Sequence, residues 1–265
     1  MVKKALLVGI NYIGTESQLS GCINDTVTMS EILIGKFKFD KVNVLTDATD
    51  IKPTKANIEV GLRELVSNSK PGDVLVFHYS GHGSNITDRS SDESDGKDEV
   101  LIPIDYNKAG IITDDWIYKN ICKAVPKGVT LWCFTDCCHS GTVIDLAFNV
   151  KSNCTPLVQG EKVYSSTKWS NNFSFSVEKV PSSLDGTVYC LSGCQDQETS
   201  ADARINGKGQ GAFTACLSQV LKGNCNVSIR EILKEVNARL DLLNFKQNSQ
   251  LGLSDMNNLG TGFTL

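Results

Sequence analysis

Short apolar runs of strand length recur along the chain and alternate with segments of helical periodicity. The runs lie at residues 5–10, 42–45, 73–79, 129–134 and 187–192. From Val74 to Phe77 every position is apolar, which is typical of strands that are buried on both faces in a parallel sheet covered by helices. The alternation therefore predicts an α/β sandwich with a mostly parallel central sheet flanked by helices.

Five segments have the spacing of apolar residues expected of helices. They lie at residues 24–34, 54–67, 114–125, 211–221 and 228–243. Thr54 is a candidate N-cap for the second helix, because a threonine hydroxyl accepts a hydrogen bond from the first backbone N–H groups. Gly35 and Pro126 are placed to end the first and the third.

The 265 residues are predicted to form a single domain. Residues 149–186 are rich in Ser, Asn and Lys and show little apolar periodicity. We interpret them as a linker between a larger part, residues 1–148, and a smaller part, residues 187–265. Residues 87–99 form a second polar break, and this one is acidic.

The composition excludes several classes of partner. The net charge of −4 gives no general attraction to nucleic acid or to anionic lipid. The apolar run after Lys3 and Lys4 is too short for a signal peptide, and no stretch is long enough to span a membrane. We therefore expect a soluble cytoplasmic protein that binds neither nucleic acid nor membrane.

In the cytoplasm the ten cysteines should be mostly reduced. Cys122 and Cys133 lie in apolar segments and are expected in the core. A disulfide framework is disfavoured because a chain of this size builds a sufficient core. A zinc site is also disfavoured, because Cys190 and Cys194 have no second pair of matching spacing.

Two of the predicted strands are followed by residues that can carry out chemistry. The first ends in His78-Tyr79-Ser80-Gly81-His82-Gly83, and the second in Asp136-Cys137-Cys138-His139-Ser140-Gly141. The carboxyl ends of parallel strands meet at one edge of a sheet, so a histidine and a cysteine placed there can approach each other. A thiol becomes a good nucleophile when an imidazole takes its proton, and this pattern indicates a cysteine nucleophile with a histidine base.

Other interpretations of these residues remain open. His78 and His82 have the spacing of a metal pair on a helix, although Ser80, Gly81 and Gly83 disfavour a helix here. His78 lies within the apolar run and is expected in the core. The adjacent cysteines could be a chance cluster of buried residues, or a redox pair without the usual Cys-x-x-Cys spacing.

With these two motifs the chain resembles the metacaspases, relatives of the caspases among the clan CD cysteine peptidases. The resemblance covers nearly the whole chain. Further matching segments fall in the expected order at residues 21–25, 98–103, 113–115, 192–196, 199–202 and 211–214. The resemblance implies a caspase-like version of the sandwich. It also implies the type I arrangement, although the chain shows none of the leaders that many metacaspases carry.

The resemblance also assigns the catalytic roles. The nucleophile is the cysteine directly before His-Ser-Gly, which is Cys138, and the base is His82. Cys137 is then a packing residue. The N–H groups of Gly83 and Cys138 would form the oxyanion hole that stabilises the tetrahedral intermediate. No third member of a triad is evident.

A specificity pocket follows from the same resemblance. Caspases proper cut after Asp and carry Gln-Ala-Cys-x-Gly around the nucleophile, whereas this chain has Asp136 two residues before Cys138. The resemblance implies a pocket lined by Cys22, Asp25, Ser80 and Asp136. Carboxylates in such a pocket favour Arg or Lys at the cleaved position. Asp136 could instead only hold a turn.

Four aspartates match positions that bind calcium in metacaspases: Asp98, Asp114, Asp115 and Asp145. Calcium prefers several hard oxygen ligands, which such a set would supply. The alternative is a solvated acidic loop followed by a helix start, where Asp is favoured without a metal. Asp95 could also replace Asp98.

Together these features predict a calcium-dependent cysteine endopeptidase that cleaves proteins or peptides after Arg or Lys. We expect a monomer that cuts its own linker at Lys151, Lys162, Lys168 or Lys179. The alternative from another functional class is a catalytically silent interaction module on the same fold.

Overall fold

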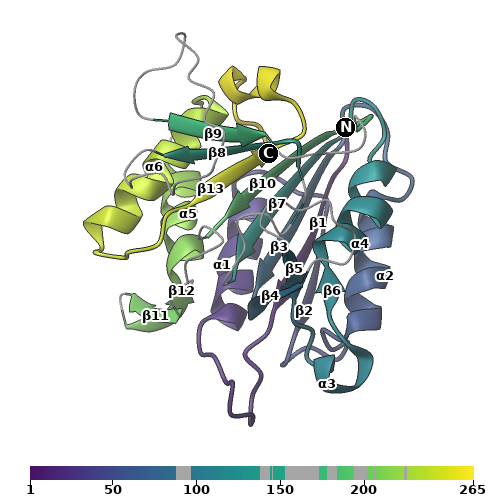
Figure 1. The fold of residues 1–265 in the computed structure, drawn as a ribbon, viewed down its shortest axis with the longest axis vertical. Coiled ribbons are helices and arrows are strands. Elements are labelled where there is room, and N and C mark those ends of the chain that lie inside the picture. The colour runs from purple at the N-terminus through teal and green to yellow at the C-terminus, as the bar shows by residue number, and fades with distance from the viewer. Residues whose placement is uncertain are drawn as a thin grey trace.

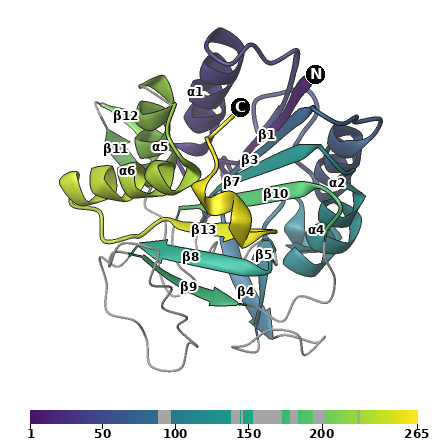
Figure 2. The ribbon, with the colours of Figure 1, turned by 90° about the horizontal axis from the view of Figure 1, so that it is seen from above.

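The computed structural model describes residues 1–87, 97–137, 144, 146–152, 173–177, 184–193, 202–205, 207–223 and 226–265. Within these ranges the chain forms layers of helices on both faces of one large sheet (Figures 1 and 2). Every described helix is too short or too polar to cross a membrane.

The large sheet has eight strands, and the part that carries the site is parallel. Its strand order is β2-β1-β3-β7-β10-β13-β8-β9, and β2, β1, β3, β7 and β10 pair in parallel. The strands in this order are β2 (Lys41–Thr46), β1 (Lys3–Gly9), β3 (Val74–Ser80), β7 (Thr130–Asp136), β10 (Thr187–Ser192), β13 (Gln250–Leu253), β8 (Phe148–Ser152) and β9 (Phe173–Val177). The last three pair antiparallel. The predicted α/β sandwich with a mostly parallel sheet is confirmed.

Helices cover the two faces of the sheet unequally. The helices are α1 (Cys22–Gly35), α2 (Lys55–Val66), α3 (Tyr106–Ala109), α4 (Asp114–Asn120), α5 (Ala212–Lys222) and α6 (Ile229–Leu242), with 3-10 turns η1 (Cys122–Ala124) and η2 (Met256–Gly260). Helices α1, α5 and α6 pack on one face, and α2 and α4 pack on the other (Figure 2). Two small sheets, β4 (Gly83–Thr87) with β5 (Lys97–Leu101) and β6 (Ile112–Thr113), and β11 (Asp202–Ile205) with β12 (Lys208–Gly211), lie outside the large one.

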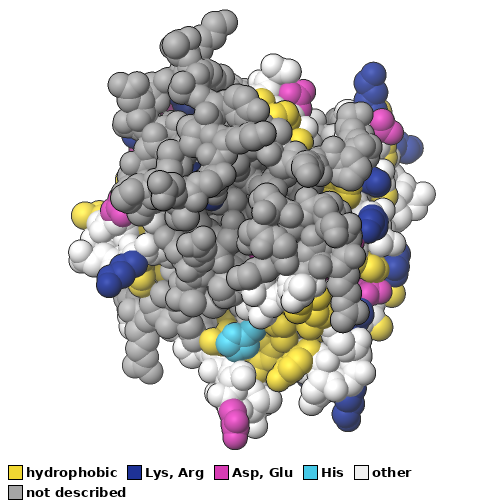
Figure 3. All heavy atoms as spheres, in the orientation of Figure 1, with side chains coloured by type: hydrophobic (Ala, Val, Ile, Leu, Met, Phe, Trp, Pro, Cys, Tyr) yellow, Lys and Arg dark blue, Asp and Glu magenta, His cyan; other side chains and the backbone are white. Residues whose placement is uncertain are grey.

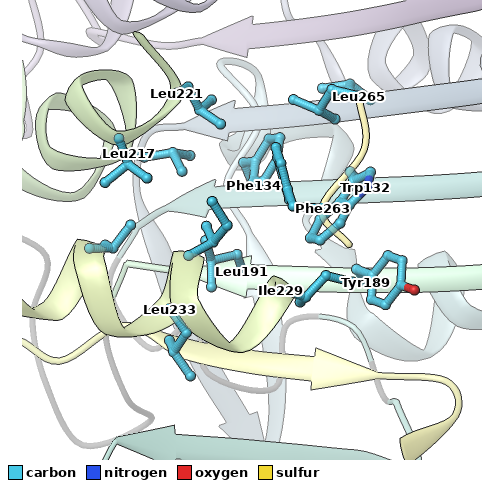
Figure 4. Packing of buried hydrophobic residues seen from close by; sticks show 14 of the residues in the cluster. Trp132, Phe134, Tyr189, Leu191, Leu217, Leu221, Ile229, Leu233, Phe263 and Leu265 are labelled. Atoms are coloured by element: carbon cyan, nitrogen blue, oxygen red, sulfur yellow. The ribbon is translucent and has the colours of Figure 1, made fainter. Parts of the chain in front are cut away.

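Burial of both faces explains why the predicted strands are apolar at consecutive positions. Leu7 of β1 belongs to the core beneath α1, α5 and α6, whereas the adjacent Leu6 belongs to the core beneath α2 and α4. On the first face Trp132 stacks on Tyr189 with ring centroids 4.2 Å apart, and Phe263 closes over it at 4.9 Å (Figure 4). Cys122 and Cys133 are buried, as predicted.

The predicted helix starts are present in the structure. The Thr54 side chain accepts a hydrogen bond from the Asn57 N–H at the start of α2. Ser228 and Glu231 form a reciprocal capping box at the start of α6. The segment predicted as one helix from residue 114 is instead divided into α4 and η1.

The polar segment that we interpret as a linker contains two strands of the large sheet. β8 lies between β13 and β9, and its Lys151 pairs with Gln250 on one side and Ser174 on the other. The expectation that Lys151 lies in an accessible connection is therefore wrong. Lys162, Lys168 and Lys179 lie outside the described residues.

Candidate active site

His82 lies two residues beyond the carboxyl end of β3, at the edge of the sheet where β7 also ends. Ser80 and Asp136, the last residues of these parallel strands, face each other in register. The Gly81 N–H donates to the Asp136 carbonyl oxygen at 3.3 Å and continues the pairing one step further. Cys138 follows Asp136 by two residues in the sequence and lies outside the described residues.

Two tyrosine hydroxyls hold the backbone of His82. The Tyr12 hydroxyl accepts the His82 N–H at 3.0 Å and donates to the Ile102 carbonyl oxygen at 2.6 Å. The Tyr79 hydroxyl donates to the His82 carbonyl oxygen at 2.8 Å. Burial raises the pKa of both hydroxyls well above their usual range, so both stay protonated and can donate.

The imidazole of His82 is oriented from two sides. Its ring lies against the Tyr12 ring, with centroids 4.7 Å apart. Its Nε2 atom lies 2.7 Å from the Ser17 carbonyl oxygen. Because a carbonyl oxygen can only accept, Nε2 carries the proton in the neutral ring and Nδ1 is left to accept one. This is the tautomer of the neutral ring that leaves Nδ1 able to accept a proton from a thiol.

The loop between β1 and α1 provides these contacts and is itself anchored. The Asp47 carboxylate accepts the backbone N–H groups of Asn11 at 2.7 Å and Ile13 at 3.2 Å. The Asn11 side chain accepts the Cys22 N–H at 2.9 Å, at the start of α1. Tyr12 has a φ of 51°, an uncommon conformation for a side-chain-bearing residue, and the surrounding hydrogen bonds hold it there.

The four residues expected to line a specificity pocket are all buried next to this edge. They are Cys22, Asp25, Ser80 and Asp136. The Ser80 hydroxyl donates to Asp25 Oδ2 at 2.7 Å, which joins the end of β3 to α1. Ser80 in turn lies opposite Asp136 in the sheet. The structure therefore gathers residues from three separate elements around one point.

The junction of β12 and α5 supplies backbone donors to both carboxylates. The Gly211 N–H donates to the two oxygens of Asp25 at 3.1 and 3.0 Å. The Thr214 N–H, in the first turn of α5, donates to Asp136 Oδ2 at 2.8 Å. Backbone N–H groups at the start of a helix favour a negatively charged acceptor, so this junction favours the ionised form of the pair.

Gly83 begins β4, and the register of β4 with β5 bears on its predicted role. Gly83 faces Leu101, and the Ile102 N–H donates to the His82 carbonyl oxygen at 3.2 Å. Antiparallel pairs alternate between hydrogen-bonded and non-hydrogen-bonded positions. Since His82 and Ile102 form the hydrogen-bonded position, the Gly83 N–H is expected to point away from β5.

The aspartates predicted to bind calcium are only partly described. Asp98 and Asp114 are buried, and Asp114 accepts the N–H groups of Glu99 at 2.5 Å and Asp115 at 2.6 Å. The Asp115 carboxylate accepts the Lys119 ammonium at 2.7 Å. In the described part of the chain no three acidic, histidine or cysteine side chains converge as a metal site would require. Asp145 lies outside that part.

Two residues have the packing roles expected from the sequence. His78 is fully buried, its Nε2 lies 3.2 Å from the Thr214 hydroxyl, and burial lowers its pKa to about 3. It is therefore a neutral core residue, and β3 is a strand, which excludes a helical metal pair with His82. Cys137 is buried in the core beneath α2 and α4.

Several residues that build the site have no signal in the sequence. Ser17 contributes only its carbonyl oxygen, which any residue could supply. Tyr12 and Tyr79 meet 3.3 Å apart although 67 positions separate them. On the face of the molecule drawn in Figure 3, histidine reaches the surface beside hydrophobic side chains. Gly211 and Thr214 were predicted only as matching positions, and their contacts with the aspartates depend on how β12 and α5 are placed.

Comparison with known proteins identifies relatives across most of the chain. A family model described as metacaspase, peptidase C14 domain matches residues 3–147. Metacaspase-2 of Trypanosoma brucei brucei is 35% identical, and the match covers 99% of this chain and 76% of that protein. Metacaspase-1 of Scheffersomyces stipitis is 35% identical over 96% of this chain and 72% of its own length.

Two further comparisons concern length and fold. Metacaspase-1 of Schizosaccharomyces pombe is 33% identical over 88% of this chain, but the match spans only 63% of that protein. A protein of Geobacter sulfurreducens, known from its crystal structure, superimposes with a TM-score of 0.69 at 25% identity. The superposition covers 100% of this chain and 99% of that one.

Proposed function

Because the chain belongs to the metacaspase family, we propose that it is a calcium-dependent cysteine endopeptidase that cleaves proteins after Arg or Lys. The observation that carries the proposal is the way in which the ring and the backbone of His82 are held. Its Nε2–H is held by the Ser17 carbonyl oxygen, its backbone is held by Tyr12 and Tyr79, and two buried carboxylates lie at the same edge of the sheet.

In the proposed reaction His82 is the proton acceptor and Cys138 is the nucleophile. His82 Nδ1 takes the proton of the Cys138 thiol, and the thiolate sulfur attacks the carbonyl carbon of the peptide bond. The carbonyl oxygen gains negative charge, which the N–H groups of Gly83 and Cys138 stabilise. His82 then returns the proton to the leaving amine as the C–N bond breaks. Water, activated by His82, hydrolyses the thioester and restores the thiol.

The pocket explains the proposed preference for Arg and Lys. Asp25 and Asp136 are buried and receive N–H donors from the start of α5, which favours their ionised forms. A cationic side chain entering the pocket would pair with these carboxylates, and a guanidinium can contact a carboxylate with two hydrogen bonds. A substrate Asp would place like charges together away from water, which costs several kcal/mol.

Calcium is proposed as the activating cation. Asp98, Asp114, Asp115 and Asp145 would hold it, because carboxylate oxygens are the ligands that calcium prefers. The cation would supply positive charge that allows these carboxylates to come together. Asp145 follows Cys138 by seven residues, so a metal bound there would connect the site to the segment that carries the nucleophile. We also propose that the protein acts as a cytoplasmic monomer and cuts its own chain at Lys162, Lys168 or Lys179.

The assignment of the nucleophile is tested by paired substitutions. Cys138→Ala should abolish hydrolysis of a fluorogenic peptide with Arg at the cleaved position. Cys137→Ala should retain most of the activity, because Cys137 is buried in the core. Equal loss in both variants, with both folded by circular dichroism, would refute the assignment. A wild-type chain that is folded and calcium-loaded yet inactive on all such peptides would instead favour a silent interaction module.

A further inference from the structure

Gly211 occupies the space between the two pocket carboxylates. Its N–H donates to both oxygens of Asp25. A Cβ atom at this position would lie 2.1 Å from Asp136 Oδ2 and 2.9 Å from Asp25 Oδ2, far inside normal contact distances. The neighbours that a side chain would meet first are thus the two carboxylates that the proposed specificity depends on.

The backbone at this position does not itself require glycine. Gly211 has φ −65° and ψ 135°, an extended conformation that any residue adopts. A glycine is usually explained by a positive φ or by a close approach. Only the close approach applies here. The absence of a side chain at residue 211 therefore leaves room for the two carboxylates.

Gly211 is also the N-cap of α5, where Ser, Thr, Asp and Asn are usually preferred because their side chains accept a free N–H of the first turn. In this protein Asp136 Oδ2 takes that place. It accepts the Thr214 N–H, three residues after the cap, at 2.8 Å. A capping side chain on residue 211 would compete with Asp136 for this donor and would occupy its position.

We propose that Gly211 is a specificity-determining residue, an inference that rests on the proposed preference for Arg and Lys. Its lack of a side chain lets Asp136 reach the start of α5, and its N–H sets the orientation of Asp25. The two carboxylates are thereby fixed in the arrangement that binds a substrate cation. Any side chain here displaces Asp136 and weakens the recognition of Arg and Lys without touching the Cys138 and His82 pair.

Two substitutions separate this role from a purely structural one. Gly211→Ala adds only the Cβ. Gly211→Ser adds the Cβ together with a hydroxyl that can accept the Thr214 N–H, so α5 keeps a cap while Asp136 loses its position. Gly35→Ala is the matched control, because a Cβ at Gly35 meets no atom within 4 Å.

The measurement compares two reagents that alkylate Cys138. Iodoacetamide has no side chain for the pocket, whereas a peptidyl-arginine chloromethyl ketone must place its guanidinium there. The rate at Cys138, followed by peptide mass mapping, should fall roughly a hundredfold for the arginine reagent in both Gly211 variants, the effect of losing a charge-assisted contact. The iodoacetamide rate and the urea midpoint of Gly211→Ser should match those of Gly35→Ala.

Each other outcome has a definite meaning. An unchanged arginine-reagent rate in folded Gly211→Ser overturns the proposal, and so does an equal fall with both reagents. Failure of both Gly211 variants to fold assigns the residue to structure and also overturns it. A wild-type chain that reacts no faster with the arginine reagent than with its norleucine analogue refutes the preference for Arg and Lys itself.

Discussion

Replacing Tyr12 by Phe is expected to weaken both the fold and the site through one atom. The Tyr12 hydroxyl stands between the His82 N–H and the Ile102 carbonyl oxygen, the position that a direct backbone hydrogen bond between β4 and β5 would otherwise occupy. Phe keeps the ring that packs against His82 at 4.7 Å and removes the hydroxyl that forms this bridge and lies 3.3 Å from the Tyr79 hydroxyl. The change therefore tests the hydroxyl and leaves the packing in place.

The size of the effect follows from which groups lose their partner. The Tyr79 hydroxyl lies 2.8 Å from the His82 carbonyl oxygen and 3.1 Å from the Ile102 carbonyl oxygen, so its single proton can be shared with Ile102. The His82 N–H loses its acceptor. One orphaned, part-buried N–H costs about 2 kcal/mol of the free energy of unfolding. Because the freed peptide belongs to the proposed base, we also expect kcat to fall roughly tenfold, about 1.4 kcal/mol of barrier, with KM unchanged.

Urea unfolding and steady-state hydrolysis of an arginyl peptide measure the two effects. Tyr189→Phe is the matched control, because Tyr189 is also buried and its hydroxyl bonds to Thr261, on a different part of the sheet. The control should lose some stability and keep its kcat. The reasoning is refuted if Tyr12→Phe unfolds within 0.5 kcal/mol of the wild type, roughly the scatter of neutral substitutions, or if kcat is unchanged.

Three further outcomes are expected. Asp25→Asn keeps an acceptor for the Gly211 N–H but loses a charge, so kcat/KM for arginyl over norleucyl peptides should fall roughly tenfold or more, and an unchanged ratio would contradict the pocket. The pKa of His78 is lowered to about 3, against about 6.5 in the unfolded chain, so between these values the unfolded chain binds more protons than the folded chain. The contribution of His78 to stability is therefore full above pH 6.5 and is lost as the pH falls toward 3. Its contribution should be about 2 kcal/mol smaller at pH 5 than at pH 7 by urea unfolding, a difference that His78→Leu should remove. Peptidase activity should rise with calcium and fall with chelator, and Asp145→Ala should blunt the response; full activity in chelator would exclude the metal.

The parallel half of the sheet could be predicted because burial on both faces leaves a strong signal. β1, β3, β7 and β10 each contain four consecutive hydrophobic residues, and the bounds predicted for each strand lie within two residues of the actual ones. β13 was missed because Gln250-Leu251-Gly252-Leu253 is short and contains a polar residue and a glycine. β8 and β9 were missed although Phe-Asn-Val-Lys-Ser and Phe-Ser-Phe-Ser-Val alternate apolar and polar residues, the pattern of a half-buried strand. Each pattern is only five residues long and lies at the start or in the middle of a segment rich in Ser, Asn and Lys.

Site residues that act through their side chains could be predicted from the sequence. Residues that contribute only backbone groups could not. His82 was predicted from the motif around it, whereas the set of Asp25, Ser80 and Asp136 was implied only by the resemblance to the metacaspases. The Ser17 carbonyl that orients His82 has no such mark. Its position depends on the path of the loop after β1. Asp47, which follows β2, fixes this loop by accepting the N–H groups of Asn11 and Ile13.

The two buried carboxylates and the backbone N–H groups that they accept are synthesised at different times. Asp25 and Asp136 precede the residues whose N–H groups they accept, Gly211 and Thr214, by 186 and 78 positions. A nascent chain that still lacks residues 211–214 already carries both aspartates, Ser80 and His82, but it lacks these two backbone donors. The order of translation thus completes the hydrogen bonds of this carboxylate pair only after the ribosome has delivered the start of α5.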